Sequence, residues 1–481
     1  MIGLGRVLSV VVVSLVLVQS AQALPRTRMY DPLLDEAMNP SSLNFTDILK
    51  SLFPWLPADS ALQGWYSQRL NPADASDLRT FGQRYYRYSG HARSDDAPVI
   101  LYIGGESQLT SRSFMGRFTE EIARAVGGHI VGLEHRYYGE SHPFTSLDTE
   151  NLQYLSTENA LGDLVRFQEF ARAQWGWTGK WIAVGGSYPG SLSAYLRLKH
   201  PDLVVGSLAS SAPVKAKNFF DEYDGHIALV LGPVCSERLR RISELAELAL
   251  DSPAAAEFKR RFDAEAVTDH RDFLYVLADA AAFAVQYGQP GPLCNALEVN
   301  QGDLVGGYAT YVRGLLGTIG STAYDFSPAV AAKLDFNADS NMRQWFYQSC
   351  KEYGYWQVAH PERLRSTRST RIDLPYHQEL CLRFYGDEIL ADDAGHNARY
   401  VDSMMDPATA SNIFLTNGST DPWINLSLSP EELAGKNGAI TSYVVDGGSH
   451  CSDLRAASSR DSASLRGARD QFLRLALDWT K

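Results

Sequence analysis

The chain has 481 residues, more than one ordinary domain of roughly 100 to 200 residues, so we expect two domains or one large domain with an insertion. With 45% hydrophobic and 21% charged residues, the composition is that of a folded globular protein and excludes extended disorder. The 56 acidic residues outnumber the 44 basic ones, and the net charge of -12 has the wrong sign for binding a phosphate backbone. We therefore expect no nucleic-acid partner.

The N-terminus has the pattern of a secretory signal peptide. Arg6 precedes an apolar run over residues 7–18, and Ala21-Gln22-Ala23 forms a small-x-small cleavage site. The run is shorter than the roughly 20 residues that cross a bilayer. We expect residues 1–23 to be removed, which leaves a secreted or lysosomal protein without a stable membrane anchor; an uncleaved anchor is the alternative.

Export would place the five cysteines in a compartment where disulfides persist, and their odd number leaves at least one without an intrachain partner. The sequence has no Cys-x-x-Cys pair and no His-Glu-x-x-His motif, so spacing gives no support for a zinc site. We expect no metal and no organic cofactor. Asn44, Asn417 and Asn425 begin Asn-x-Ser/Thr sequons that would carry glycans in a eukaryotic source.

Short apolar runs alternate with helical periodicity in the first half of the chain. The expected strands cover residues 99–103, 129–133, 181–184 and 204–208, and the expected helices between them cover 117–126 and 158–174. This alternation indicates an α/β fold with a mostly parallel sheet covered on both faces, whose sites form at the carboxyl ends of the strands.

The pattern changes between about residues 215 and 404, where long amphipathic stretches rich in Ala and Leu replace the strands. We expect a helical cap insertion here, between a first part of the α/β domain over residues 24–214 and a second part over 405–481. Two strand patterns and an amphipathic helix follow, at residues 413–416, 440–445 and 463–479. The sheet is thus expected to be interrupted and then completed.

The most informative local pattern is Gly-Gly-Ser-Tyr-Pro-Gly at residues 185–190, between strand-forming and helix-forming residues. A strand, a tight turn and a helix in this order are typical of a nucleophile elbow, in which a serine hydroxyl, here that of Ser187, projects above the sheet. The next amide, that of Tyr188, would point into an oxyanion hole. Pro189 replaces the second Gly of the motif, a departure that the first turn of a helix tolerates.

A serine nucleophile needs a carboxylate and a base, which in this architecture follow the last strands in that order. Asp421 follows the strand pattern at 413–416, and His450 follows the one at 440–445. A neutral imidazole at His450 would take the proton of Ser187 while Asp421 fixes its tautomer. A turn aspartate and a surface histidine are the alternatives.

The second oxyanion donor should come from the loop after an early strand. Ile-Gly-Gly-Glu-Ser at residues 103–107 occupies such a junction, and the amide of Gly104 or Gly105 is our candidate. An ordinary turn is the alternative.

Together these motifs resemble the serine peptidase family of lysosomal Pro-X carboxypeptidase, dipeptidyl peptidase II and thymus-specific serine protease. The likeness extends over most of the chain beyond the leader, and the Tyr-Gly-Tyr and Ser-His-Cys runs are most similar to the thymus-specific branch. The motifs that carry it lie at residues 134–141, 154–161, 185–190, 210–214, 347–354, 417–423 and 448–451.

The resemblance implies an α/β-hydrolase fold with a helical cap inserted after a strand that ends near Pro213. It implies a catalytic triad of Ser187, Asp421 and His450. It also implies two disulfides, Cys235–Cys294 and Cys350–Cys381. Cys451 would lie beside the catalytic histidine outside any disulfide, either as a small buried residue or as a reactive thiol. Homodimers occur in this family and are expected here on the same ground.

Members of the family cleave peptides after proline, some from the carboxyl terminus and some from the amino terminus, so the resemblance implies peptide substrates. Trp423 is our candidate for a wall of the proline pocket, with core packing as its alternative. Glu352 is our candidate to bind an amino terminus, although Lys351 replaces the Thr that the family has before it. Carboxypeptidase and dipeptidyl peptidase both remain open. The rival functions are a lipase or esterase with the same triad, and a non-catalytic binding protein.

Overall fold

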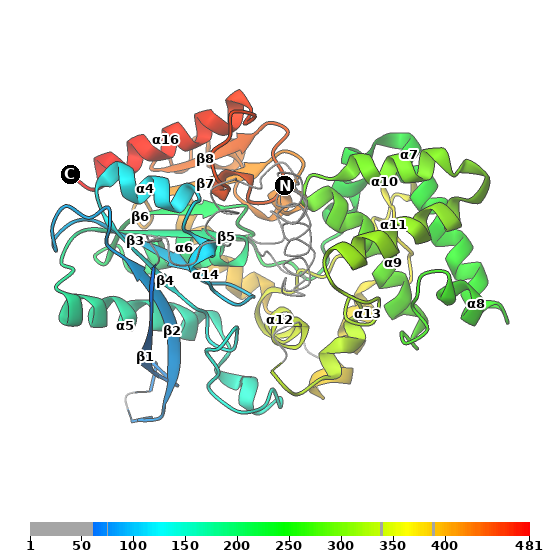
Figure 1. Cartoon of the computed structure of the whole chain (residues 1–481), viewed down its shortest axis with the longest axis horizontal. Coiled ribbons are helices and arrows are strands. Elements are labelled where there is room, and N and C mark those ends of the chain that lie inside the picture. The colour runs from blue at the N-terminus through cyan, green and yellow to red at the C-terminus, as the bar shows by residue number, and fades with distance from the viewer. Residues whose placement is uncertain (1–60, 75, 337–339, 387–389) are drawn as a thin grey trace, which may run out of the picture.

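The computed structural model describes residues 61–481 apart from residues 75, 337–339 and 387–389 (Figure 1). The leader expected over residues 1–23 and the sequon at Asn44 lie outside the described residues. Among the residues that are described, no helix has both the length and the apolar character needed to cross a membrane.

An eight-stranded sheet occupies the centre of the larger lobe (Figure 1). Its order is β1-β2-β4-β3-β5-β6-β7-β8; β2 is antiparallel to both neighbours, and every other pair is parallel. The strands are β1 (Leu62–Arg69), β2 (Thr80–Tyr88), β3 (Val99–Ile103), β4 (His129–Leu133), β5 (Trp181–Gly186), β6 (Val204–Ser210), β7 (Ile413–Gly418) and β8 (Ile440–Val445). This is the α/β-hydrolase fold, as predicted.

Helices cover both faces of the sheet, which explains why β3, β4, β5 and β7 are buried along their whole length. On one face, α4 (Phe118–Val126) packs against α16 (Ala463–Trp479) through the rings of Phe118 and Phe472. The other face carries α5 (Thr157–Trp175), α6 (Tyr188–Lys199) and α14 (Asp393–Met405).

A helical lobe is inserted between β6 and β7 and lies to the right in Figure 1. Its main helices are α7 (Glu222–Leu250), α8 (Ala255–Arg260), α9 (His270–Gln286), α10 (Pro290–Val299), α11 (Leu304–Thr318), α12 (Met342–Gln348) and α13 (Leu374–Tyr385). The predicted cap is therefore present. Its limits at residues 215 and 404 stay a prediction. Helix α14 lies almost wholly within those limits but packs on α6 of the sheet domain, where Tyr400 stacks on Tyr195.

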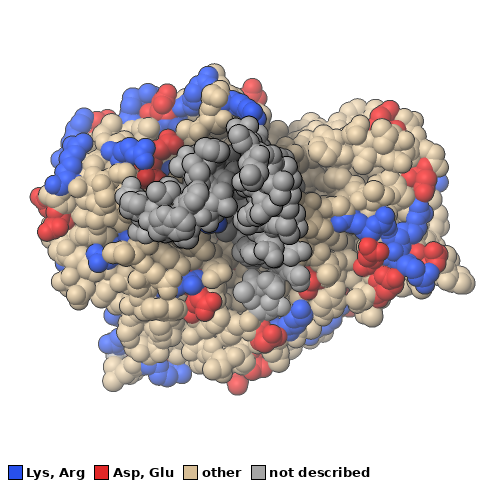
Figure 2. Space-filling model, in the orientation of Figure 1, with Lys and Arg blue, Asp and Glu red and all other residues tan. Residues whose placement is uncertain are grey.

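Both expected disulfides form within this insertion. Cys235–Cys294 joins α7 to α10, and Cys350–Cys381 joins the turn after α12 to α13. On the face shown in Figure 2, acidic and basic side chains are intermixed. The insertion also carries exposed ion pairs such as Arg261–Asp303. Pairs exposed in this way contribute little to stability.

Candidate active site

Ser187 occupies a strained turn between β5 and α6. Its φ of 63° and ψ of -134° are unusual for a residue with a side chain. Glycines make room for the turn: a Cβ on Gly185 would lie 2.1 Å from the carbonyl oxygen of Pro189, and one on Gly190 would lie 2.8 Å from that of Ser210. This is the geometry of the predicted elbow, with the serine at the carboxyl end of the strand.

Pro189 is accommodated by a glycine of another loop. As the second residue of α6 it gives up an amide that has no partner within the helix. Its ring lies against the loop after β3, where a Cβ on Gly105 would be only 2.4 Å from the proline Cγ. The departure from the usual elbow motif thus requires a glycine at position 105.

Asp421 and His450 lie together, fully buried, after β7 and β8. The Nδ1 atom of His450 is 2.7 Å from Oδ2 of Asp421, and the other carboxylate oxygen accepts a hydrogen bond from the amide of Trp423. A carboxylate in this position fixes the imidazole with its proton on Nδ1 and leaves Nε2 as the nitrogen suited to act as a base.

The elbow and the histidine loop converge over the end of β6. The carbonyl oxygen of Ser210 accepts the amide proton of Ser187 at 2.8 Å and also faces the Sγ atom of Cys451 at 3.8 Å. The amide of Cys451 donates to the hydroxyl of Ser211. Cys451 is completely buried, which fits the interpretation of a small buried residue beside His450.

Two backbone amides near the elbow have no hydrogen-bond acceptor within the described part of the chain. They are the amides of Tyr188, the first residue of α6, and of Gly105. The amide of Gly104 donates to the carbonyl of Leu133 in the sheet at 2.9 Å, so it is not available to a substrate. Of the two glycine candidates, Gly105 is the one whose amide remains available as an oxyanion donor.

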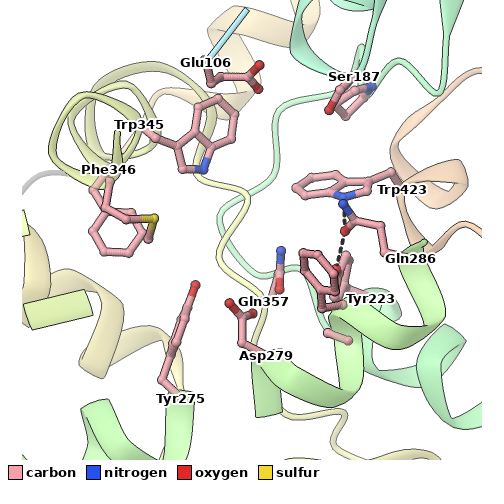
Figure 3. Close-up of a pocket in the computed structure, with 14 residues that line it drawn as sticks. Glu106, Ser187, Tyr223, Tyr275, Asp279, Gln286, Trp345, Phe346, Gln357 and Trp423 are labelled. Atoms are coloured by element: carbon pink, nitrogen blue, oxygen red, sulfur yellow. Dashed lines mark hydrogen bonds between the residues drawn. The ribbon is translucent and has the colours of Figure 1, made fainter. Parts of the chain in front are cut away.

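Ser187 opens into a pocket of about 670 Å³, partly open to solvent, between the carboxyl edge of the sheet and the insertion (Figure 3). Trp423 is one of the lining residues and donates from Nε1 to Gln286 of α9; its role as the wall of a proline pocket stays a prediction. Aromatic and apolar side chains form most of the wall: Tyr223, Tyr275, Phe283, Met342, Trp345, Phe346 and Trp423. A concave site with several aromatic side chains and a few polar groups in its wall is typical of ligand pockets.

Glu352 is not among the residues that line this pocket. Its carboxylate accepts hydrogen bonds from the amide and the hydroxyl of Thr157, at 2.9 and 2.7 Å, at the start of α5. Burial raises its pKa to about 7. Since Thr157 already satisfies the carboxylate, the structure does not support Glu352 as the group that meets a substrate terminus.

Glu106 is a pocket residue that the sequence interpretation missed, although it directly follows the two glycines that drew attention to this loop. Its side chain is buried at the pocket wall, and its Oε2 atom has no hydrogen-bond partner among the described residues. Burial raises its pKa to about 8. The Nδ2 atom of Asn341 donates to the backbone carbonyl of Glu106 and so fastens this loop to the start of α12.

The motif at residues 134–141 supports the loop after β3, which carries Gly105. The buried carboxylate of Glu134 accepts from Nη2 of Arg84 at 2.6 Å, from the hydroxyl of Ser141 and from the amide of Leu109. The last bond joins the loop after β4 to the loop that carries Gly105. Burial raises the pKa of Glu134, and the nearby Arg84 opposes the shift.

The family model described as "Serine carboxypeptidase S28" matches residues 68–472. The chain is 38% identical to "Probable serine protease EDA2" of Arabidopsis thaliana, across 76% of this chain and 75% of that protein. It is 32% identical to "Thymus-specific serine protease" of Mus musculus across 87% of each chain, and 33% identical to "Lysosomal Pro-X carboxypeptidase" of Bos taurus across 44% of each. These matches confirm the resemblance inferred from the motifs: the chain belongs to the S28 family of serine peptidases.

Proposed function

We propose that the protein hydrolyses peptides after proline through an acyl-enzyme on Ser187, with His450 as the general base and Asp421 as the carboxylate that orients it. The observation that carries the proposal is the buried hydrogen bond between Asp421 and His450, at the edge of the sheet where Ser187 opens into a pocket. S28 membership supports the reaction class, because these relatives are named as serine proteases and carboxypeptidases.

In the first half of the reaction, the Ser187 oxygen bonds to the carbonyl carbon of the substrate as His450 takes its proton. The amides of Tyr188 and Gly105 would hold the oxyanion. Collapse of the intermediate breaks the C–N bond as the imidazolium protonates the departing amine. Water then attacks the ester with His450 again as base, and serine is restored without a metal or an organic cofactor.

The preference for proline rests on the shape and chemistry of the pocket wall. The rings of Trp423 and Tyr223 meet edge to face at 5.4 Å, and the Tyr355 ring makes a second edge-to-face contact with Trp423 at 5.4 Å. A rigid aromatic wall suits a pyrrolidine ring, which is apolar and has no amide proton to satisfy. The relative named "Lysosomal Pro-X carboxypeptidase" supports the same preference.

We further propose that the protein acts outside the cytosol. Its two disulfides support this, since such bonds persist in secreted and vesicular compartments. Recovery of an oxidised, signal-cleaved enzyme from culture medium would support export, and retention of a reduced protein inside the cell would contradict it. Homodimerisation remains a prediction, which light scattering of the purified protein would test.

The test is turnover, from pH 4 to 8, of fluorogenic peptides with proline or alanine before the cleaved bond, using Ser187→Ala as the control. Fluorophosphonate labelling reports whether the nucleophile is active. We expect labelling and post-proline cleavage that both disappear in Ser187→Ala. Labelling without cleavage of any peptide would contradict the substrate class, and turnover of esters alone would favour the lipase or esterase alternative.

A further inference from the structure

The substrate pocket has an uneven distribution of charge. Two carboxyl groups line it, those of Glu106 from the loop after β3 and Asp279 from α9, whereas no Lys, Arg or His is among the lining residues in the described part of the chain. In Figure 3 both carboxylates point into the space between the sheet edge and the insertion. A ligand that enters this pocket therefore meets two acidic side chains and, among the described lining residues, no basic one.

Among the residues that the structure describes, no cation interacts with Glu106. Its titratable neighbours are Tyr138, Tyr188 and Tyr355, whose phenols stay neutral because burial raises their pKa values well above the usual range. On the far side of the pocket, Arg368 lies 5.8 Å from the centre of the Tyr223 ring. That guanidinium is already engaged, by Asp224 at 3.7 Å and by the carbonyl oxygen of Gln357.

A buried carboxylate oxygen without a partner destabilises the fold, and natural proteins rarely retain one without a function. Here it lies in the same pocket as Ser187, so the missing partner can be supplied by the substrate. The complementary group on a peptide is its terminal ammonium, which carries a positive charge and three donors. Glu106 thus has the properties required of the receptor for a peptide amino terminus.

We infer that Glu106 binds the free α-amino group of the substrate, so that the enzyme releases residues from the amino terminus of peptides ending at a proline. This inference rests on the proposed peptidase function and adds the end of the chain that is recognised. A carboxyl terminus in this pocket would face Glu106 and Asp279, and the described lining residues include no cation to neutralise it.

The experiment compares wild type with Glu106→Gln on three fluorogenic peptides: a free-amine X-Pro dipeptide, its N-acetylated counterpart, and an N-blocked peptide that ends in Pro-X with a free carboxylate. Gln has nearly the size of Glu and keeps hydrogen-bonding atoms but cannot carry the negative charge. The matched control is Glu431→Gln on the exposed turn of α15 (Pro430–Leu433), which we expect to leave every rate unchanged.

We expect wild type to prefer the free-amine dipeptide, and Glu106→Gln to lower kcat/KM for that substrate by about 100-fold, as for loss of a buried charge pair. Turnover of the N-acetylated peptide should change little. A merely structural role for Glu106 would instead lower both rates together and would overturn the inference.

Two further outcomes would also overturn it. Preference for the blocked Pro-X peptide, with its rate preserved in Glu106→Gln, would mean that a protonated Glu106 donates to a substrate carboxylate. Loss of free-amine selectivity in Asp279→Asn but not in Glu106→Gln would assign the receptor to α9. In both cases Ser187-dependent cleavage after proline continues, so the proposed function survives; absence of such cleavage in wild type would reject the function itself.

Discussion

Glu106 should lower the stability of the fold at alkaline pH, and Glu106→Gln should remove that effect. Burial raises its pKa from 4.5 to about 8 in the folded protein. Below pH 4.5 the carboxyl is protonated in both the folded and unfolded states, and it has no effect on the pH dependence. Between pH 4.5 and 8 the unfolded state loses its proton and the folded state keeps it, so the free energy of unfolding falls as the pH rises.

The size of the effect follows from that interval. At about 1.36 kcal/mol per pH unit, ionisation of Glu106 removes about 4 to 5 kcal/mol by pH 8. For a chain of 481 residues, an unfolding entropy of about 2 cal/mol/K per residue converts this into ~1 °C of melting temperature per kcal/mol. The melting temperature of Glu106→Gln minus that of wild type should therefore be about 4 °C more positive at pH 8.5 than at pH 5.

Scanning calorimetry of oxidised protein at the two pH values measures this difference. The subtraction cancels any constant effect of the amide and the contributions of the other buried carboxyls, including Glu352. Glu431→Gln serves as the exposed control and should show the same difference from wild type at both pH values. A Glu106→Gln difference that does not change with pH would show that Glu106 is ionised throughout, which would refute the argument from burial.

Three other predictions concern the elbow, the triad and the sequons. Asp421→Asn should lower kcat by about 10⁴-fold, because the imidazole would lose its orienting acceptor. Circular dichroism should show that the variant stays folded. A decrease in kcat of less than tenfold would exclude Asp421 from that role. Gly105→Ala should lower kcat by about 100-fold with little change in KM, because the new Cβ would lie 2.4 Å from Pro189 and displace an oxyanion donor; an unchanged kcat would remove its amide from the hole. In a eukaryotic host, the exposed Asn425 should carry a glycan and the buried Asn417 should not, which mass spectrometry of Asn→Gln variants would decide.

The sequence predicts the core strands and helices well because their apolar periodicity coincides with their burial. It misses β1 and β2 for a physical reason. Strand β1 is an edge strand in which only Gln68 is buried and the other residues are exposed or half-buried, so it lacks a buried apolar face. Strand β2 buries Gln83 and Arg84, which donate hydrogen bonds to Glu134 and Asp163 on other elements. A hydropathy pattern counts such residues as surface.

The site likewise contains residues that the sequence predicts and residues that only the structure can assign. Ser187, Asp421 and His450 stand at strand ends, where chain order and turn chemistry reveal them. Assigning the two glutamates needs contacts that the sequence does not display. Glu352 is satisfied by Thr157, 195 residues away, whereas the side chain of Glu106 faces a cavity that exists only once the insertion lies over the sheet.

Gln286, at the end of α9, connects the insertion to the loops that follow the last strands. Its backbone oxygen accepts the amide of His450 at 2.9 Å, and its side-chain oxygen accepts from both Trp423 and Tyr223. Lifting this helix away from the sheet would break the support of the catalytic base and the aromatic wall together. If His450 is the base, as proposed, we expect the active conformation to be one in which the insertion stays closed over the sheet and does not lift to admit the middle of a polypeptide. We therefore expect substrates to enter by a chain end, and internal prolines of folded proteins to remain uncleaved.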